Sequence, residues 1–108
     1  MTDTKRLIRI LIRRSLRKNT ELKSNQYEIL EGNYEFPPTP YSNGFSEKHP
    51  CIFVDVDEIS AEEGWSRGDL EKIADDIKVE VLRYADEKDT MIKVYPFVDQ
   101  WDNIVVQY

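Results

Sequence analysis

The residues best suited to chemistry are two aspartates that follow an apolar run. Asp55 and Asp57 stand two positions apart after Cys51–Val54, and the alternation of a strand would place both on one face. Paired carboxylates can hold a hard divalent cation. Phosphoryl chemistry with two metals would need further ligands and a base or a lysine. We therefore interpret the motif as a solvated acidic turn. Asp55 and Asp57 remain the only candidate metal ligands, and the sequence predicts neither a metal centre nor another cofactor.

The chain has one cysteine and one histidine, Cys51 and His49. A single histidine builds neither a metal site nor a catalytic triad. Cys51 stands at the head of an apolar run with no base near it in sequence, which is typical of a small buried hydrophobic residue. Glycine-rich phosphate loops are also missing from the sequence. We therefore predict that the protein is not an enzyme.

Length and composition indicate one globular domain, residues 1–108. The chain is 40% hydrophobic and 33% charged, with a net charge of −6. That charge is unevenly distributed. Residues 1–50 hold nine Lys and Arg against six Asp and Glu, a balance of +3, while residues 51–108 hold six against fifteen, a balance of −9. This division favours electrostatic self-complementarity or two separate contact surfaces.

We expect a cytoplasmic protein without a membrane partner, or a virion-associated one if the chain is of phage origin. No apolar run approaches the roughly 20 residues of a membrane-spanning helix. The apolar residues near the N-terminus are interleaved with arginines, and no small-residue cleavage site follows them, unlike a secretory signal.

Residues 1–18 predict a basic amphipathic helix over Lys5–Lys18. An apolar stripe with helical spacing is formed by Leu7, Ile8, Leu11, Ile12 and Leu16. The candidate partner-binding residues on the other side and the borders are Arg6, Arg9, Arg13, Arg14, Arg17 and Lys18.

Several functions are compatible with this helix. Its arginines can be solvated or paired with the acidic half, can contact another subunit, or can bind nucleic-acid phosphates. A membrane-surface role lacks a Trp or Phe anchor. Nucleic-acid binding is possible but not favoured, because the helix lacks interleaved aromatic residues and a recognisable docking motif. We predict that Arg9, Arg13 and Arg17 meet carboxylates, either in the acidic half or on a neighbouring subunit.

Residues 19–50 predict an irregular, proline-rich arm. The segment 27–36 could form a small hairpin that turns at Glu31–Asn33, and the prolines after it exclude a helix. A loop of this length in a small domain is usually functional or disordered. Its aromatic residues are further candidates for partner binding: Tyr34, Phe36, Tyr41 and Phe45.

Residues 51–108 predict a β-α-β-β core. The first strand covers Cys51–Ile59, and a short helical turn at Ser60–Glu63 is interrupted by Gly64. A long helix then begins at Ser66, with Asp69 as its capping-box partner, and ends near Glu87. Alternation at Ile77–Ala85 leaves a strand there as the alternative. The last two strands are expected within 90–98 and 103–108, with Pro96 at a bulge or an edge.

Together these elements predict an α+β domain in the order α-β-α-β-β. Two helices would pack on one face of a three- to four-stranded mixed sheet. A right-handed crossover through the long helix would make the strands before and after it parallel. The other face of the sheet would be open to solvent or to a partner.

We predict a non-enzymatic protein-protein interaction or assembly subunit, of the kind found in a phage or a mobile element. Its expected partners are other protein subunits, in a homo- or hetero-oligomer. One alternative is a small acidic inhibitor or regulator that binds another protein. The other is an accessory protein that binds nucleic acid through the basic helix.

Overall fold

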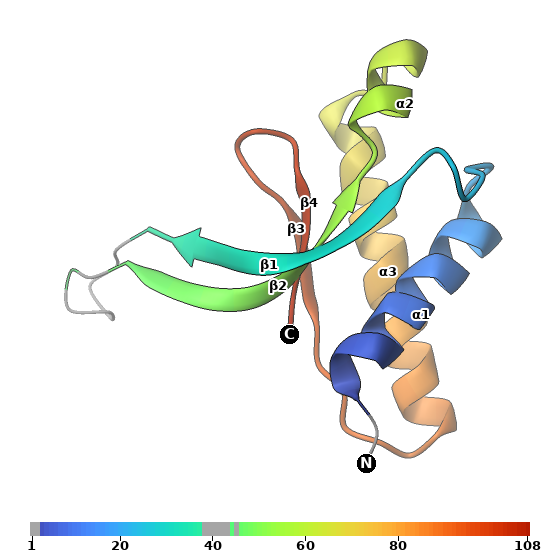
Figure 1. The fold of residues 1–108 in the computed structure, drawn as a ribbon. Coiled ribbons are helices and arrows are strands. Elements are labelled where there is room, and N and C mark those ends of the chain that lie inside the picture. Colours follow the sequence, from blue (N-terminus) through green and yellow to red (C-terminus); the bar gives the residue numbers. More distant parts are fainter. Residues whose placement is uncertain (1–2, 38–43, 45) are drawn as a thin grey trace.

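The computed structural model describes residues 3–37, 44 and 46–108. Within them the chain forms three helices and four strands (Figure 1). In chain order these are α1 (Thr4–Asn19), β1 (Glu28–Phe36), β2 (Glu47–Asp55), α2 (Asp57–Glu63), α3 (Arg67–Glu87), β3 (Tyr95–Val98) and β4 (Ile104–Gln107). The strands form one antiparallel sheet in the order β1-β2-β4-β3. The α+β class predicted from the sequence is therefore confirmed.

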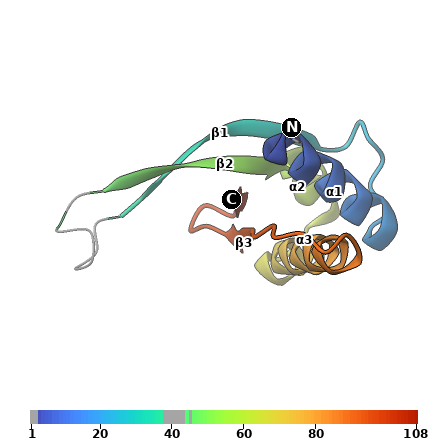
Figure 2. The same ribbon diagram turned by 90° about the horizontal axis from the view of Figure 1, so that it is seen from below.

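Helix α1 forms where the apolar spacing predicts it, extended by one residue at each end. The Asp3 side chain accepts hydrogen bonds from the backbone N–H groups of Lys5 and Arg6, which caps the helix. Its buried stripe faces α3, and the two helices lie side by side in both views (Figure 2). The residues buried at this contact include Ile8, Leu11, Ile12, Leu16, Ile77 and Val81. Burying each such side chain stabilises the fold by roughly 1.5–3 kcal/mol.

A short helical segment, a break and a long helix form as predicted, but the first begins at Asp57 rather than Ser60. With this helix and strand β1, the predicted order α-β-α-β-β is wrong. Gly64 ends α2 with φ 65°, a left-handed conformation that glycine adopts without strain. The capping box of Ser66 and Asp69 then starts α3. Because α3 continues to Glu87, the alternative strand at Ile77–Ala85 is wrong. The first core strand also ends earlier than expected, at Asp55, because α2 begins two residues later.

The predicted turn at Glu31–Asn33 is wrong, because these residues lie inside the nine-residue strand β1. Gly32 pairs with Cys51 in the middle of the hairpin. A Cβ atom on Gly32 would lie 3.0 Å from Cε2 of Phe53, so this glycine allows the phenyl ring to lie close to the strand. Residues 19–50 are therefore not irregular throughout, since β1 and the first part of β2 lie within them.

The predicted mixed sheet is also wrong. Strands β2 and β3 run in the same direction, but β4 lies between them and pairs antiparallel with both. Ile104, Val105 and Val106 of β4 are all buried, which suits a central strand. Pro96 lacks an amide proton and lies in the edge strand β3, as expected for proline.

We predict that Ile77→Ala lowers the free energy of unfolding by about 2–5 kcal/mol, because Ile77 is fully buried between the helices and the substitution leaves a cavity. Val79→Ala is the matched control, since Val79 lies on the same helix and is 55% exposed. Its expected change is within about 0.5 kcal/mol. Chemical denaturation of both variants measures the difference, and a loss below about 1 kcal/mol for Ile77→Ala contradicts the packing.

Candidate functional site

The outward side of α1 carries four exposed arginines around one exposed isoleucine. Burial of the apolar stripe turns this side to solvent. Ile10 is 43% exposed, and the arginines stand three, four and seven positions from it, which places them around it on the helix surface. We call Ile10 with these residues the arginine face: Arg6, Arg13, Arg14 and Arg17.

The other basic residues of α1 lie at its borders and make intramolecular ion pairs. Lys5 and Arg9 contact the carboxylate of Glu31 on β1, at 3.6 and 3.0 Å. The Lys18 Nζ atom lies 3.3 Å from Oε2 of Glu80 on α3. Glu80 is buried, so the lysine compensates the charge of its carboxylate. These contacts help to hold α1 against the sheet and α3.

Of the three arginines predicted to meet carboxylates, Arg9 is the one that does so among the described residues. Its partner Glu31 lies in residues 1–50, not in the acidic half. No carboxylate of the described residues lies within 4.0 Å of Arg13 or Arg17. Their contact with a neighbouring subunit stays a prediction.

The sheet has one face covered by α1 and α3 and one face without a helix. Residues paired in register share a face, and Ile52, Val54, Ile104 and Val106 belong to the core under the helices. The alternate residues therefore point to the helix-free face. Its central rows hold Leu30, Gly32, Tyr34, His49, Cys51, Phe53, Tyr95, Phe97, Val105 and Gln107, and Phe36 lies in the next row opposite Glu47.

Aromatic rings from three strands meet on this face. The ring centroid of Tyr34 lies 5.0 Å from Phe36 and 5.4 Å from Phe97, distances typical of attractive edge-to-face pairs. Tyr34 and Phe97 belong to the two edge strands, so the sheet curls until its edges approach each other. Cys51 and Val105, which point to the same face, are fully buried.

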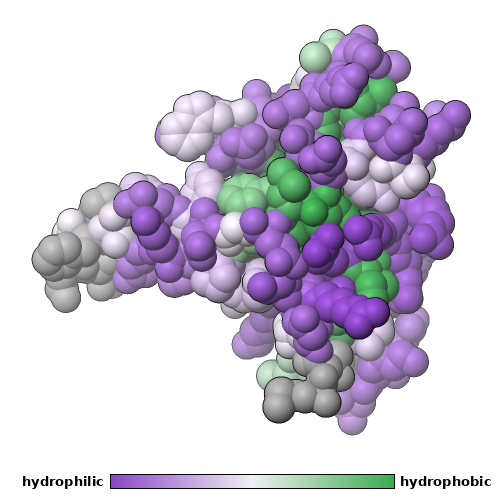
Figure 3. All heavy atoms as spheres, viewed as in Figure 1, coloured by the Kyte–Doolittle hydropathy of each residue, from purple (hydrophilic) through white to green (hydrophobic). Residues whose placement is uncertain are grey.

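The hairpin of β1 and β2 extends away from both helices (Figure 2). The pairing of β2 with β4 stops at Cys51, so the outer part of the hairpin has two strands only. In Figure 3 hydrophobic side chains gather at the centre of the side shown, around the base of the hairpin, within a hydrophilic surround. Tyr41 and Phe45, also predicted to bind a partner, lie outside the described residues.

Asp99 organises the loop between β3 and β4. Its buried carboxylate accepts hydrogen bonds from the backbone N–H groups of Trp101 and Asn103, both at 2.9 Å, and from the Tyr34 hydroxyl at 3.4 Å. Burial alone would raise the pKa of Asp99, but these bonds and one from the Asn103 side chain outweigh it, so the pKa is lowered. The pKa of Tyr34 is raised by partial burial and by the charge of Asp99.

Arg67 joins the first turn of α3 to the same loop. Its guanidinium donates hydrogen bonds to the carbonyl oxygens of Val98 and Asp99, at 2.6 and 2.7 Å, and contacts the carboxylate of Asp102 at 3.1 Å. Sequence reasoning missed both Asp99 and Arg67. The Asp-x-x-x-Asn spacing from Asp99 to Asn103 is a local signal that could have identified the hydrogen bonds within the loop. The contacts of Arg67 have no such signal, because they join residues some 30 positions apart in the sequence.

The two candidate metal ligands lie at the junction of β2 and α2. Asp55 accepts a hydrogen bond from the Asp57 backbone N–H at 3.0 Å, which shapes the turn into the helix. The pKa of Asp57 is raised, chiefly by partial burial and then by the charge of Asp55. In the described part of the chain no three His, Cys, Asp or Glu side chains are grouped to hold a metal ion. Burial raises the pKa of the Cys51 thiol, which disfavours the reactive thiolate.

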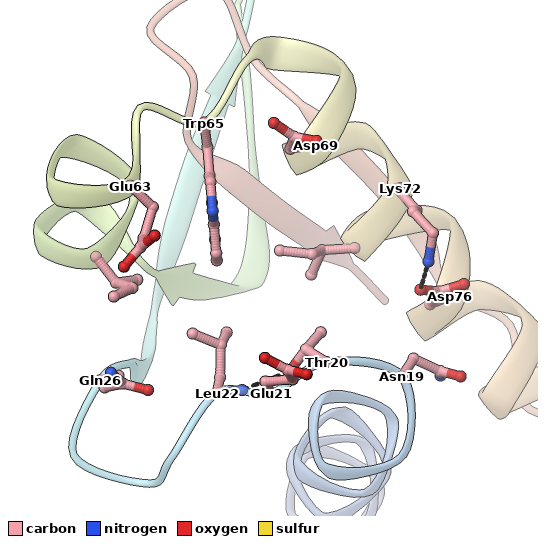
Figure 4. A pocket seen from close by; sticks show the side chains of 12 residues that line it. Asn19, Thr20, Glu21, Leu22, Gln26, Glu63, Trp65, Asp69, Lys72 and Asp76 are labelled. Atoms are coloured by element: carbon pink, nitrogen blue, oxygen red, sulfur yellow. Dashed lines mark hydrogen bonds and ion pairs between the residues drawn. The ribbon is translucent and has the colours of Figure 1, made fainter.

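A cleft of about 410 Å³ lies between the end of α1, the segment that follows it, α2 and α3 (Figure 4). Its apolar walls come from Leu22, Ile59, Trp65 and Ile73. Figure 4 shows the Trp65 side chain extending into the space between these elements. The charged residues that line it are Glu21, Glu63, Asp69, Lys72 and Asp76. No local pattern in the sequence marks this cleft, because its walls are distant in the chain.

No protein-family model matches the chain, and searches of curated proteins and of solved structures found no significant match. None of the three helices, in the part of the chain that the structure describes, has the length and apolar character needed to cross a membrane. The surfaces described above are therefore the basis for any functional proposal.

We predict that Asp99→Asn lowers the free energy of unfolding at pH 7 by about 1–3 kcal/mol, because a charged acceptor of several hydrogen bonds is lost. The folded-state pKa of Asp99 lies below its unfolded value of about 3.9. Its stabilisation is therefore complete above that value and is lost as pH falls through the folded pKa.

Urea denaturation between neutral pH and pH ~3 tests this linkage. The difference between wild type and Asp99→Asn should shrink toward acid. Asp102→Asn, in the same loop but exposed, serves as the control and should cost less than about 1 kcal/mol. An equal deficit for Asp99→Asn at both ends of the pH range contradicts the role of the ionised carboxylate.

Proposed function

We propose that the protein is a non-enzymatic assembly subunit that associates with a second copy of itself through the helix-free face of its sheet. One observation carries this proposal. The three central rows of that face, which pair Leu30 with Phe53, Gly32 with Cys51 and Tyr34 with His49, contain no Asp, Glu, Lys or Arg, and neither do their neighbours on β4 and β3. The acidic residues of the face lie in the two flanking rows, where Glu28 pairs with Asp55 and Glu47 pairs with Phe36.

The composition of this face is that of an interface core. Aromatic residues are enriched and charged residues are depleted at the buried centre of protein interfaces. Leu30 and Tyr95 are 45% and 57% exposed, so they offer apolar area that a partner would cover. Tyr34, Phe36 and Phe53 are partly exposed beside them. Rigid aromatic rings of this kind bury large area at a small cost in conformational entropy.

The uncharged centre of this face is suited to a second copy. The chain carries a net charge of −6, so two copies repel each other at long range. A face without charged side chains at its centre minimises that repulsion at contact. Two identical uncharged faces can also meet across a two-fold axis, the commonest symmetry of protein dimers.

The outer hairpin supports the same proposal. A ribbon of only two strands is marginally stable in water, and this one is held at its base by the aromatic cluster. A second copy bound to the helix-free face would also cover part of this two-stranded ribbon. Two of the acidic residues have structural roles, since Asp99 orders a loop and Asp69 caps α3.

We predict that, at moderate salt, the mass of the wild type in sedimentation rises with concentration toward twice that of the monomer. At the same salt Leu30→Lys/Tyr95→Lys should remain monomeric, because two lysines would be desolvated at the contact. Val79→Lys/Leu82→Lys is the control, since these apolar residues are similarly exposed on α3, and it should behave as wild type. A wild type that stays monomeric, or equal effects of both pairs, contradicts the proposal.

The arginine face favours a second candidate function, the binding of nucleic-acid phosphates. Its four arginines are exposed, and no carboxylate of the described residues lies within 4.0 Å of them. Neutralised phosphates release counterions, so the affinity would fall steeply with salt. The net acidity of the chain opposes this function, although a local patch acts within a Debye length of about 8–10 Å.

Gel shift of duplex DNA at low and moderate salt tests this second function. It predicts salt-sensitive binding that Arg13→Glu/Arg17→Glu abolishes. Lys78→Glu/Arg83→Glu reverses two exposed charges on α3 and should retain most of the binding. The absence of binding at low salt rules out this function for the helix.

A further inference from the structure

The cleft beside Trp65 is lined by negative charge that the described chain does not fully neutralise. Asp76 pairs with Lys72 at 3.1 Å, and the Asp69 carboxylate is occupied by the capping box. No Lys or Arg of the described residues lies within 4.0 Å of Glu21 or Glu63. These two carboxylates remain available to a cation from outside.

Helix α2, which ends at the cleft, adds to this negative potential, because the carbonyl end of a helix carries partial negative charge. Helix α1 also ends there, at Asn19, but Arg17 and Lys18 lie in its last turn and offset that charge. Helix α2 ends at Glu63 with no basic residue in its last turn. Below the charged residues lie the apolar walls of Leu22, Ile59 and Trp65, and an indole face attracts a cation. The cleft is thus suited to an apolar group accompanied by positive charge.

The arginine face of α1 has the complementary pattern. Exposed Ile10 is surrounded by Arg6, Arg13, Arg14 and Arg17, whereas the cleft has apolar walls accompanied by carboxylates. No arginine lines the cleft, and no carboxylate of the described residues contacts this face. Both halves of a complementary contact therefore lie on one chain, unpaired with each other.

We infer that the arginine face of one copy docks in the Trp65 cleft of a second copy. Ile10 meets the apolar walls, and guanidinium groups bond the carboxylates of Glu21 and Glu63, for which their planar fork is suited. The contact joins two different surfaces, so it is heterologous and produces a ring or an open chain of subunits. It goes beyond the association proposed for the helix-free face and does not depend on it.

The test separates the two halves of the contact. Glu63→Arg changes the cleft and leaves the arginine face intact, whereas Arg13→Glu/Arg17→Glu does the reverse. All three positions are exposed, so the variants should fold. Both are made in a Leu30→Lys/Tyr95→Lys background, so that association through the helix-free face does not contribute. At low salt the parent with this background alone should self-associate, and moderate salt should return it to the monomer by screening the charges.

We predict that each variant alone self-associates roughly tenfold more weakly than the parent, because attraction is replaced by repulsion. Mixing the two should restore association as a one-to-one pair, since one supplies an intact arginine face and the other an intact cleft. Glu62→Arg, next to Glu63 but not lining the cleft, is the control and should behave as the parent.

A Trp101→Phe substitution in both chains leaves Trp65 as the single tryptophan. Its fluorescence should change when the variants are mixed, which places the contact at the cleft. Mixed variants that stay monomeric without a fluorescence change overturn the inference, as does a Glu63→Arg chain that self-associates like the parent. Neither result bears on the association through the helix-free face, which is tested by the substitutions at Leu30 and Tyr95.

Discussion

The rest of the structure depends on the packing of α1 against α3. Four apolar residues of α1 and the facing residues of α3 are almost completely removed from water, and burial of this kind is the main favourable contribution to folding. Both helices lie on the same face of a four-stranded sheet. In the part of the chain that the structure describes, no helix covers the other face. The helix-free face is therefore a direct consequence of where α1 lies.

The same packing decides the position of the charges. Because the apolar stripe of α1 is buried, its arginines face solvent around Ile10, and only the residues at its borders reach Glu31 and Glu80. The end of α1 also forms one side of the Trp65 cleft. One helix thus provides both a basic surface and part of an acidic one. This arrangement is the physical basis for contacts between copies.

Local signals in the sequence were sufficient for the helices. The spacing of apolar residues and the caps at Asp3, Gly64 and Ser66 act over a few positions, so they could be recognised without a structure. Gly32 shows the limit of such signals. It resembles a turn residue locally, but its role is to admit the ring of Phe53, which lies 21 positions along the chain. The residues next to a glycine in the sequence do not show whether it forms a turn or allows a close approach between strands.

The sequence by itself determined the α+β class, the two long helices and the amphipathic character of α1, because these depend on periodicity and capping. Only the tertiary structure decided the strand order, in which β4 pairs with β2 through its buried residues and the proline-containing strand β3 pairs with β4 at the edge. It also decided which candidate residues meet. Tyr34, Phe36 and Phe97 come together because the sheet curls, and the Trp65 cleft forms because α1, α2 and α3 converge. These contacts join residues far apart in sequence, and no local pattern encodes such distances.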